Sequence, residues 1–161
     1  MPFIIDGHNL LWCIQTAEED KSITEVALCR ILDSFFRQIS PRRVIAEIIF
    51  DGPGPLNKQE FEAINNLDVT FSGRSCDCDT IIENRILAST APKQLTIVST
   101  DRRLRGAAEA RKANPVKSED FWDQVKKQLS RPRKSKEPAG KRKGLTQSET
   151  ELWLREFGIK Q

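Results

Sequence analysis

Four aspartates occupy positions in this sequence where a carboxylate can do chemistry. Asp6, Asp51 and Asp101 each follow an apolar run, and Asp79 opens a helical pattern. Carboxylates that converge in one cleft repel each other, and a cation between them lets them stay ionised. Oxygen ligands suit Mg²⁺ or Mn²⁺, which activate water for attack on a phosphodiester. The pattern therefore favours a metal-dependent hydrolase.

Each acid also has a structural interpretation. Asp6 fits a hydrogen bond to a loop, and Asp51 fits the turn that follows it. Asp79 and Asp101 fit ordinary helix N-caps, a position that Asp often occupies. Asp77 lies two residues before Asp79 and is either a further acid of the site or a cap. The sequence leaves open which of the two holds metal.

The sequence lacks the residue motifs of other reaction classes. The sequence has no Ser-His-Asp order, no G-x-S-x-G, no Walker A loop and no G-x-G-x-x-G. His8 is the only histidine, and we interpret it as a loop residue rather than a catalytic base. The four cysteines form no pair of C-x-x-C knuckles, so we expect reduced, mostly buried thiols and no zinc site.

The elements that position the acids follow from hydrophobic periodicity and from breakers. We predict strands and helices in alternation, which is typical of a parallel sheet with helices on both faces. The predicted strands are Phe3–Ile5, Val44–Phe50, Leu67–Phe71, Leu95–Ser99 and Val116–Lys117, and the helices are Ile23–Ile39, Glu60–Asn65, Thr80–Ser89, Arg102–Lys112 and Glu119–Leu129. Right-handed crossovers bring the carboxyl ends of such strands to one edge, where ligands bind. The acids are therefore expected to meet there.

Residues around these elements carry local expectations. Gly7 permits a sharp turn after the first strand. Asn9 either braces Asp6 or contacts substrate. Ser22 and Ser118 are expected to cap the helices that follow them.

Three arginines follow Asp101. Arg102, Arg103 and Arg105 are either phosphate contacts near the cleft or a solvated helix face. Trp12 is expected to be a packing residue rather than a platform for base stacking.

Charge is unevenly distributed along the 161 residues, whose net charge is +3. The segment Arg131–Lys143 is dense in lysine and arginine and holds one acid. It predicts a polyanionic partner, with nucleic acid first, and the alternative is a solvated linker without a partner. Lys134, Lys141 and Arg142 are candidate substrate contacts in this segment.

Length and composition complete the outline. We expect one domain over residues 1–130, a basic, disordered linker over 131–145 and a short helix over 146–161. No apolar stretch approaches the roughly 20 residues of a membrane span, and the first residues lack the basic leader of a signal peptide. A cytoplasmic protein without a membrane partner is expected.

Four motifs in order resemble a known family. Ile4–Leu10 resembles the opening of the NYN domains, and most closely their YacP-like branch. Ile49–Gly52 is similar to the second acidic strand end of that family, and Asp79–Glu83 to its A-D-x-x-I-E helix start. Val98–Arg102 is similar to its V-T-S-D strand end. The resemblance covers about Phe3–Leu129.

The resemblance implies a PIN-like (Rossmann-like) α/β fold and an Mg²⁺- or Mn²⁺-dependent endoribonuclease. Members of this branch are linked to cleavage of messenger RNA on the ribosome, so single-stranded mRNA is the implied substrate. Asp6, Asp79 and Asp101 correspond to the catalytic and metal-binding acids, with Asn9 beside them and Asp51 in the second rank. Asp77 is an extra acid relative to the motif.

Two other functions remain open. The same fold without catalysis would be an RNA- or ribosome-binding module, which binds without metal and tolerates Asp6→Asn. Related PIN-like folds cut branched DNA, but the sequence has no insertion long enough for an arch or clamp. The oligomeric state is not predicted.

Overall fold

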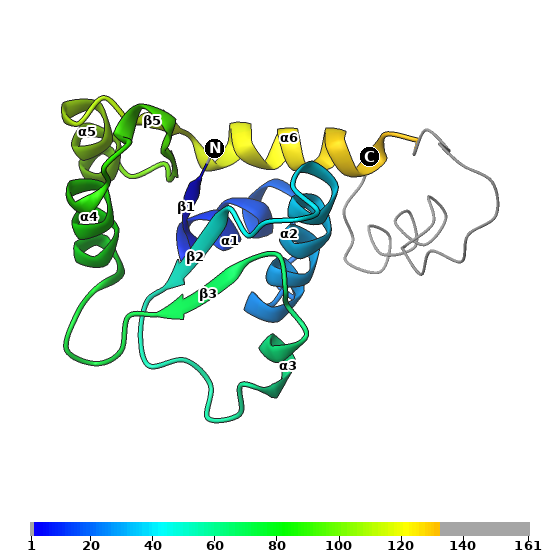
Figure 1. Ribbon diagram of the computed structural model, residues 1–161. Coiled ribbons are helices and arrows are strands. Elements are labelled where there is room, and N and C mark those ends of the chain that lie inside the picture. Colours follow the sequence, from blue (N-terminus) through cyan, green and yellow to red (C-terminus); the bar gives the residue numbers. More distant parts are fainter. Residues whose placement is uncertain (1, 133–161) are drawn as a thin grey trace.

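A five-stranded parallel sheet forms the centre of the computed structural model, which describes residues 2–132 (Figure 1). Its order is β3-β2-β1-β4-β5, and every neighbouring pair is parallel. The strands are β1 (Phe3–Asp6), β2 (Ala46–Phe50), β3 (Asp68–Phe71), β4 (Thr96–Val98) and β5 (Asn114–Val116). The predicted α/β class with a parallel sheet is confirmed.

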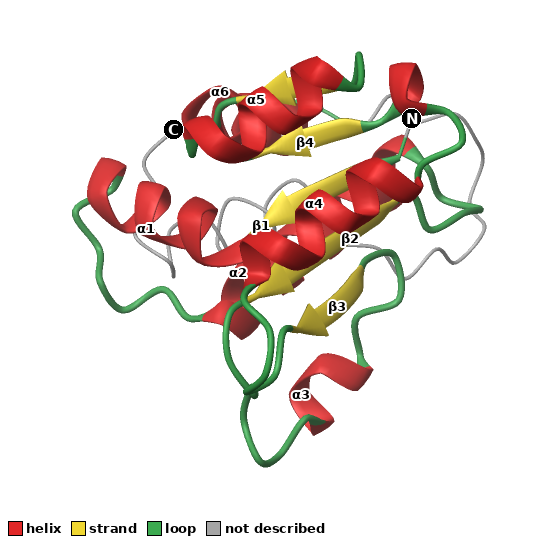
Figure 2. Cartoon of the chain, turned by 90° about the vertical axis from the view of Figure 1, so that its left-hand side faces the viewer, coloured by secondary structure: helices red, strands yellow, loops and turns green. Residues whose placement is uncertain are grey.

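Helices cover both faces of this sheet (Figure 2). The helical elements are α1 (Gly7–Ala17), α2 (Glu25–Ile39), α3 (Gln59–Glu62), α4 (Cys78–Ala88), the 3₁₀ turn η1 (Pro92–Gln94), α5 (Arg102–Ala110) and α6 (Ser118–Ser130). Helices α1, α2 and α6 pack on one face, and α4 and α5 pack on the other. Residues from the two helical layers can therefore approach each other only at the ends of the strands.

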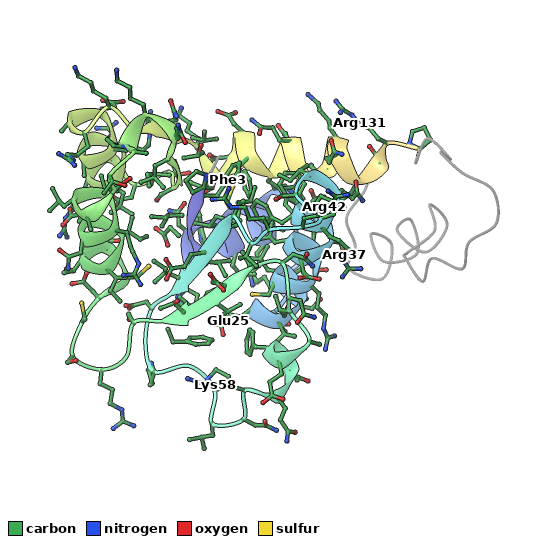
Figure 3. All side chains as sticks on the ribbon, in the orientation of Figure 1. Phe3, Glu25, Arg37, Arg42, Lys58 and Arg131 are labelled. Atoms are coloured by element: carbon green, nitrogen blue, oxygen red, sulfur yellow. The ribbon has the colours of Figure 1, made fainter. Side chains whose placement is uncertain are left out.

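The central strands read as continuous apolar runs because both of their faces are buried. In β1, Ile5 packs into the core under α1, α2 and α6, and Ile4 packs into the core under α4 and α5. Phe3, which is labelled in Figure 3, belongs to an aromatic cluster of the larger core. Its ring contacts the rings of Phe36 and Phe121. Burial of such side chains supplies about 1.5–3 kcal/mol each.

The first helix begins earlier than the sequence indicates. Helix α1 starts at Gly7, directly after β1, where we predicted only a sharp turn. Glycine is needed at position 7 for a different reason. A Cβ there would lie 2.5 Å from the Phe50 ring and 3.0 Å from the Ile49 carbonyl oxygen. Close approach of β2 therefore requires the glycine.

Two predicted caps are wrong. Thr24, not Ser22, caps α2, and its hydroxyl accepts a 3.2 Å hydrogen bond from the Ala27 N–H. Ser118 is the first residue of α6, and its hydroxyl bonds to a distant side chain instead of capping the helix. A serine close to a helix start is ambiguous because a neighbouring residue can supply the cap.

One strand boundary differs from the prediction, and two predicted segments fall largely or wholly outside the described residues. Strand β5 starts at Asn114, earlier than the predicted Val116–Lys117. The predicted linker over residues 131–145 falls almost entirely outside the described residues, and the helix over 146–161 falls wholly outside them. Between residues 2 and 132, no helix is both long and apolar enough to cross a bilayer.

Candidate active site

The four aspartates lie along one edge of the sheet, at the carboxyl ends of its strands. Asp6 ends β1, and Asp51 follows the last residue of β2. Asp101 precedes the first residue of α5, and Asp79 is the second residue of α4. Parallel strands place these four positions at the same edge of the sheet.

Asp6 is the most buried of these acids, with 7% of its surface exposed. Burial raises the pKa of its carboxyl group. Hydrogen bonds from the Asn9 N–H at 3.3 Å and from the Ser99 hydroxyl at 3.1 Å oppose that rise. The negative charges of Asp79 and Asp101 raise this pKa further, which shows that the three carboxylates share one electrostatic environment.

Asp79 belongs to the same cluster. Burial raises its pKa, the charge of Asp101 raises it further, and Arg103 lowers it. A guanidinium nitrogen of Arg103 lies 4.0 Å from Asp79 Oδ2. Asp6, Asp79 and Asp101 therefore lie close enough for the charge of Asp101 to affect the pKa of the other two acids.

Ser99 connects two of these acids and was not among the predicted site residues. Its hydroxyl donates to Asp6 Oδ2 and accepts a 3.1 Å bond from the Asp101 N–H. The side chain is fully buried. Asp101 itself caps α5, with Oδ1 accepting from the Arg103 N–H at 2.7 Å. A small polar residue at the end of an apolar strand was the sequence signal for Ser99.

Asp51 and Asp77 make local structural bonds beside the cluster. Asp51 Oδ1 accepts from the Ser72 hydroxyl at 3.0 Å and from the Cys78 N–H at 3.1 Å. Asp77 caps α4 by accepting a 2.7 Å bond from the Thr80 N–H, which lowers its pKa. Of the two acids at this helix start, Asp77 is the cap, and Asp79 lies in the electrostatic cluster.

The donor chemistry of the cluster fits a hard divalent cation. Carboxylate oxygens are the ligands that Mg²⁺ and Mn²⁺ prefer. Burial and, to a lesser extent, repulsion between acids raise the pKa of Asp6 and Asp79, and a cation would relieve that repulsion. Over residues 2–132, however, no three His, Cys, Asp or Glu side chains stand in position to share one ion.

Asn9 and His8 both make bonds inside the fold. The Asn9 Oδ1 accepts from the Thr100 N–H at 2.9 Å and from the Ser118 hydroxyl at 2.6 Å. A substrate contact by Asn9 must therefore use its amide nitrogen. The His8 Nδ1 accepts from the Asp51 N–H, so Nε2 carries the proton and donates to Glu25 at 2.6 Å.

The three arginines of α5 have different environments. Arg103 makes a bidentate ion pair with Glu83, at 2.6 and 2.8 Å. Arg102 is exposed, and within the described part of the chain neither Arg102 nor Arg105 has an acidic partner. The Arg105 Nε is buried there without a hydrogen bond. Arg102 and Arg105 are therefore the better candidates for phosphate contacts.

Three other predictions complete the comparison with the sequence. Trp12 is 63% exposed, so its prediction as a packing residue is wrong. Lys134, Lys141 and Arg142 lie outside the described residues. The four cysteines are free thiols, three buried and Cys76 partly exposed, as predicted.

Fold and acidic edge together define an α/β protein of the PIN-like class, and the similarity to known proteins is more specific. The chain belongs to the YacP-like NYN domain family, whose sequence profile matches residues 3–156. This match extends beyond the Phe3–Leu129 resemblance and includes residues predicted as linker and terminal helix. No curated protein sequence matches at a significant level.

Solved structures agree on the fold. The crystal structure of Rae1 (YacP) from Bacillus subtilis matches with a TM-score of 0.60 and 14% identity, covering 80% of this chain and 75% of that chain. Its W164L mutant matches with a TM-score of 0.58 and 15% identity, covering 80% and 77%. At this identity the likeness shows a common PIN-like fold.

Proposed function

We propose that this protein is a metal-dependent endoribonuclease that hydrolyses phosphodiester bonds of single-stranded RNA. The NYN family is one of PIN-like nucleases, which implies a function related to RNA. The observation that carries the proposal is the position of Asp6, Asp79 and Asp101 at the ligand-binding edge of the sheet, where the charge of Asp101 adds to the burial that raises the pKa of Asp6 and of Asp79.

The residues of this chain have distinct tasks in the proposed reaction. A bound Mg²⁺ or Mn²⁺ would polarise the phosphodiester and lower the pKa of a coordinated water. Asp6, Asp79 and Asp101 would hold that ion, with Asp51 and Asp77 as outer acids. The bonds from Asn9 and Ser99 fix the orientation of the Asp6 carboxylate.

Substrate contacts lie on the α5 side of the cluster and in the basic segment. Arg102 and Arg105 supply positive charge to the phosphates next to the cut. Lys134, Lys141 and Arg142 add affinity that is independent of sequence and sensitive to salt. The resemblance to the YacP-like branch extends the proposal to mRNA on translating ribosomes in the cytoplasm.

Cleavage of labelled single-stranded RNA with Mn²⁺ or Mg²⁺ tests this function. We expect Asp6→Asn and Asp79→Asn to lose at least about 100-fold in rate, because each removes charge that holds the ion. Asp68→Asn is the matched control, since Asp68 is an exposed acid at the amino end of β3. Cutting that survives in both site variants would contradict the proposal.

The second candidate, a binding module, has an observation in its favour. The described residues contain no ready three-ligand metal group. A module of this kind predicts RNA binding in EDTA that Asp6→Asn leaves unchanged, with no metal-dependent cutting even on translating ribosomes. The same proteins and RNAs therefore separate the two functions.

A further inference from the structure

A pocket of about 410 Å³ lies beside the acidic cluster, between the loops that follow β2 and β3 and the first turn of α4. Figure 1 shows the connection from β3 running to the start of α4. The pocket is lined by Asp51, Gly52, Gly73, Arg74, Ser75, Cys76, Asp77 and Thr80. Asp51 and Asp77 are outer acids in the proposed function, and none of the tasks described above uses Arg74 or the other lining residues.

Hydrogen bonds fix the walls of this pocket. The Gly73 N–H donates to the Gly52 carbonyl at 2.8 Å, and the Gly52 N–H donates to the Ser72 hydroxyl at 2.9 Å. Gly52 and Gly73 have φ of +94° and +82°, which side chains rarely adopt. The two loops therefore form a built wall whose backbone geometry depends on glycine.

The pocket combines one cation with two anions. Arg74 is exposed and makes no ion pair or side-chain hydrogen bond with any described residue. Asp51 and Asp77 each accept through Oδ1, and in the same part of the chain neither Oδ2 has a partner. Two carboxylates beside one guanidinium disfavour a phosphate inside the pocket, because the local charge is negative.

A nucleobase fits this mixture better than a phosphate. Unpaired RNA bases are read at their edges by hydrogen bonds and covered by arginine guanidinium planes. Guanine presents O6 and N7 as acceptors for arginine, and its N1–H and N2–H₂ groups donate to a carboxylate. Arg74 can donate to O6 and N7, and the carboxylates of Asp51 and Asp77 can accept from N1–H and N2–H₂.

The position of the pocket suits a base near the scissile phosphate. Asp77 lines the pocket, and Asp79, two residues later, belongs to the acidic cluster. The sheet order places the β3 end with Arg74 and the β4 end with Arg102 on opposite sides of β1. An RNA strand that runs along this edge meets Arg74, the acids and Arg102 in turn.

We propose that this pocket binds one base of the RNA strand, that guanine is the base it fits, and that Arg74 determines this specificity. The proposal rests on the proposed function, because it treats the neighbouring acids as the site of cutting. It adds a preference for a base on one side of that site.

Cys76 provides a probe of the pocket that does not depend on cutting. It is the partly exposed thiol of the four, while Cys13, Cys29 and Cys78 are buried. The full chain in EDTA is treated with iodoacetamide, with and without an oligouridylate that carries one central guanosine, and alkylation of each cysteine is followed by mass spectrometry. We expect the guanosine oligonucleotide to protect Cys76, and an all-uridine oligonucleotide to require about tenfold more RNA.

Matched variants identify the role of Arg74. Arg74→Ala is expected to raise the RNA concentration for half protection about tenfold. Arg42→Ala is the control, because Arg42 is an exposed arginine before β2, on the side of the molecule away from the β3–α4 connection (Figure 3). Alkylation of the three buried thiols reports any loss of fold.

The outcomes separate the pocket from the nuclease. No protection of Cys76 in the parent, equal protection by both oligonucleotides, or equal loss in Arg74→Ala and Arg42→Ala would overturn the pocket proposal. Parent protein that cuts RNA with Mn²⁺ but shows no protection would overturn the pocket and leave the nuclease standing. Protection by guanosine RNA without any cutting would support the pocket and contradict the nuclease.

Discussion

The amide oxygen of Asn9 accepts a 2.6 Å hydrogen bond from the hydroxyl of Ser118, 109 residues further along the chain. The same oxygen accepts from the Thr100 N–H at 2.9 Å. These bonds join the start of α1 to the end of β4 and the start of α6. Ser118 is fully buried, so its hydroxyl has no access to water if the partner is lost.

Replacement of Asn9 is therefore expected to reduce stability as well as activity. Asn9→Ala leaves the Ser118 hydroxyl and the Thr100 N–H without their acceptor, which costs about 2 kcal/mol in the free energy of unfolding. Urea unfolding measures this loss. Asn84→Ala, at an exposed position of α4, is the control and is expected to stay within about 0.5 kcal/mol of the parent. Equal effects of the two substitutions would contradict the role of the Asn9 hydrogen bonds in stabilising the fold.

Two glycines in helices are expected to respond in opposite directions to alanine. Gly7→Ala places a Cβ against the Phe50 ring and should destabilise the fold by about 2 kcal/mol. Gly106→Ala meets no atom within 4 Å and should stabilise α5 by about 0.5–1 kcal/mol. Thermal or chemical unfolding of both variants measures these two changes in stability. A neutral Gly7→Ala would mean that β2 does not approach α1 as described.

The raised pKa of Asp79 has a defined sign for stability. Above the ordinary value of 3.8, the folded state holds this proton more tightly than the unfolded state, so stability falls as pH rises through the raised pKa. Asp79→Asn is therefore expected to raise the melting temperature at pH 7 without metal, by about 1–2 °C because the carboxylate is partly exposed to solvent. The difference should vanish at pH 3. Adding Mn²⁺ should stabilise the parent and not the variant, and the reverse ranking would contradict a cation site.

Arg103 and Arg102 are adjacent but are expected to act differently. Arg103 lowers the pKa of Asp79, so Arg103→Gln should move the acid limb of the pH–rate profile to higher pH. Arg102→Gln removes an exposed charge that has no acidic partner among residues 2–132, and should weaken RNA binding without moving that limb. The pH dependence of kcat, measured for both variants, tests this. Identical profiles would assign both arginines to the same task.

The basic segment is expected to set the salt dependence of RNA binding. Each phosphate contact on single-stranded RNA adds about 0.7 to the slope of log affinity against log salt. Replacement of Lys134, Lys141 and Arg142 by alanine should therefore reduce that slope by about 2. The control replaces Arg30, Arg42 and Arg43, which are exposed elsewhere. An unchanged slope in the first variant would exclude the segment as an RNA contact.

The edge that carries the acids was predictable from sequence because it depends on local signals and one topological rule. Apolar runs ending in Asp6 and Asp51 marked the strands, and alternation with helices indicated parallel pairing. The A-D-x-x-I-E resemblance pointed to Asp79, which the structure separates from the cap Asp77.

The remaining features depend on contacts between distant residues, which a single sequence does not encode in its periodicity. The Asn9–Ser118 bond and the Glu83–Arg103 ion pair join residues that no local pattern associates. The start of α1 was missed because Gly7 resembles a turn residue, and its packing against Phe50 appears only when β1 and β2 pair. Trp12 was misread because an aromatic residue in an apolar run usually packs inside.

Strand β1 is made first during synthesis, yet it occupies the middle of the sheet and pairs with both β2 and β4. A growing chain that has not reached Val98 exposes one side of β1 and lacks Ser99 and Asp101. The acids of the site assemble only after that strand has left the ribosome. The proposed nuclease activity therefore requires a chain that extends past Asp101.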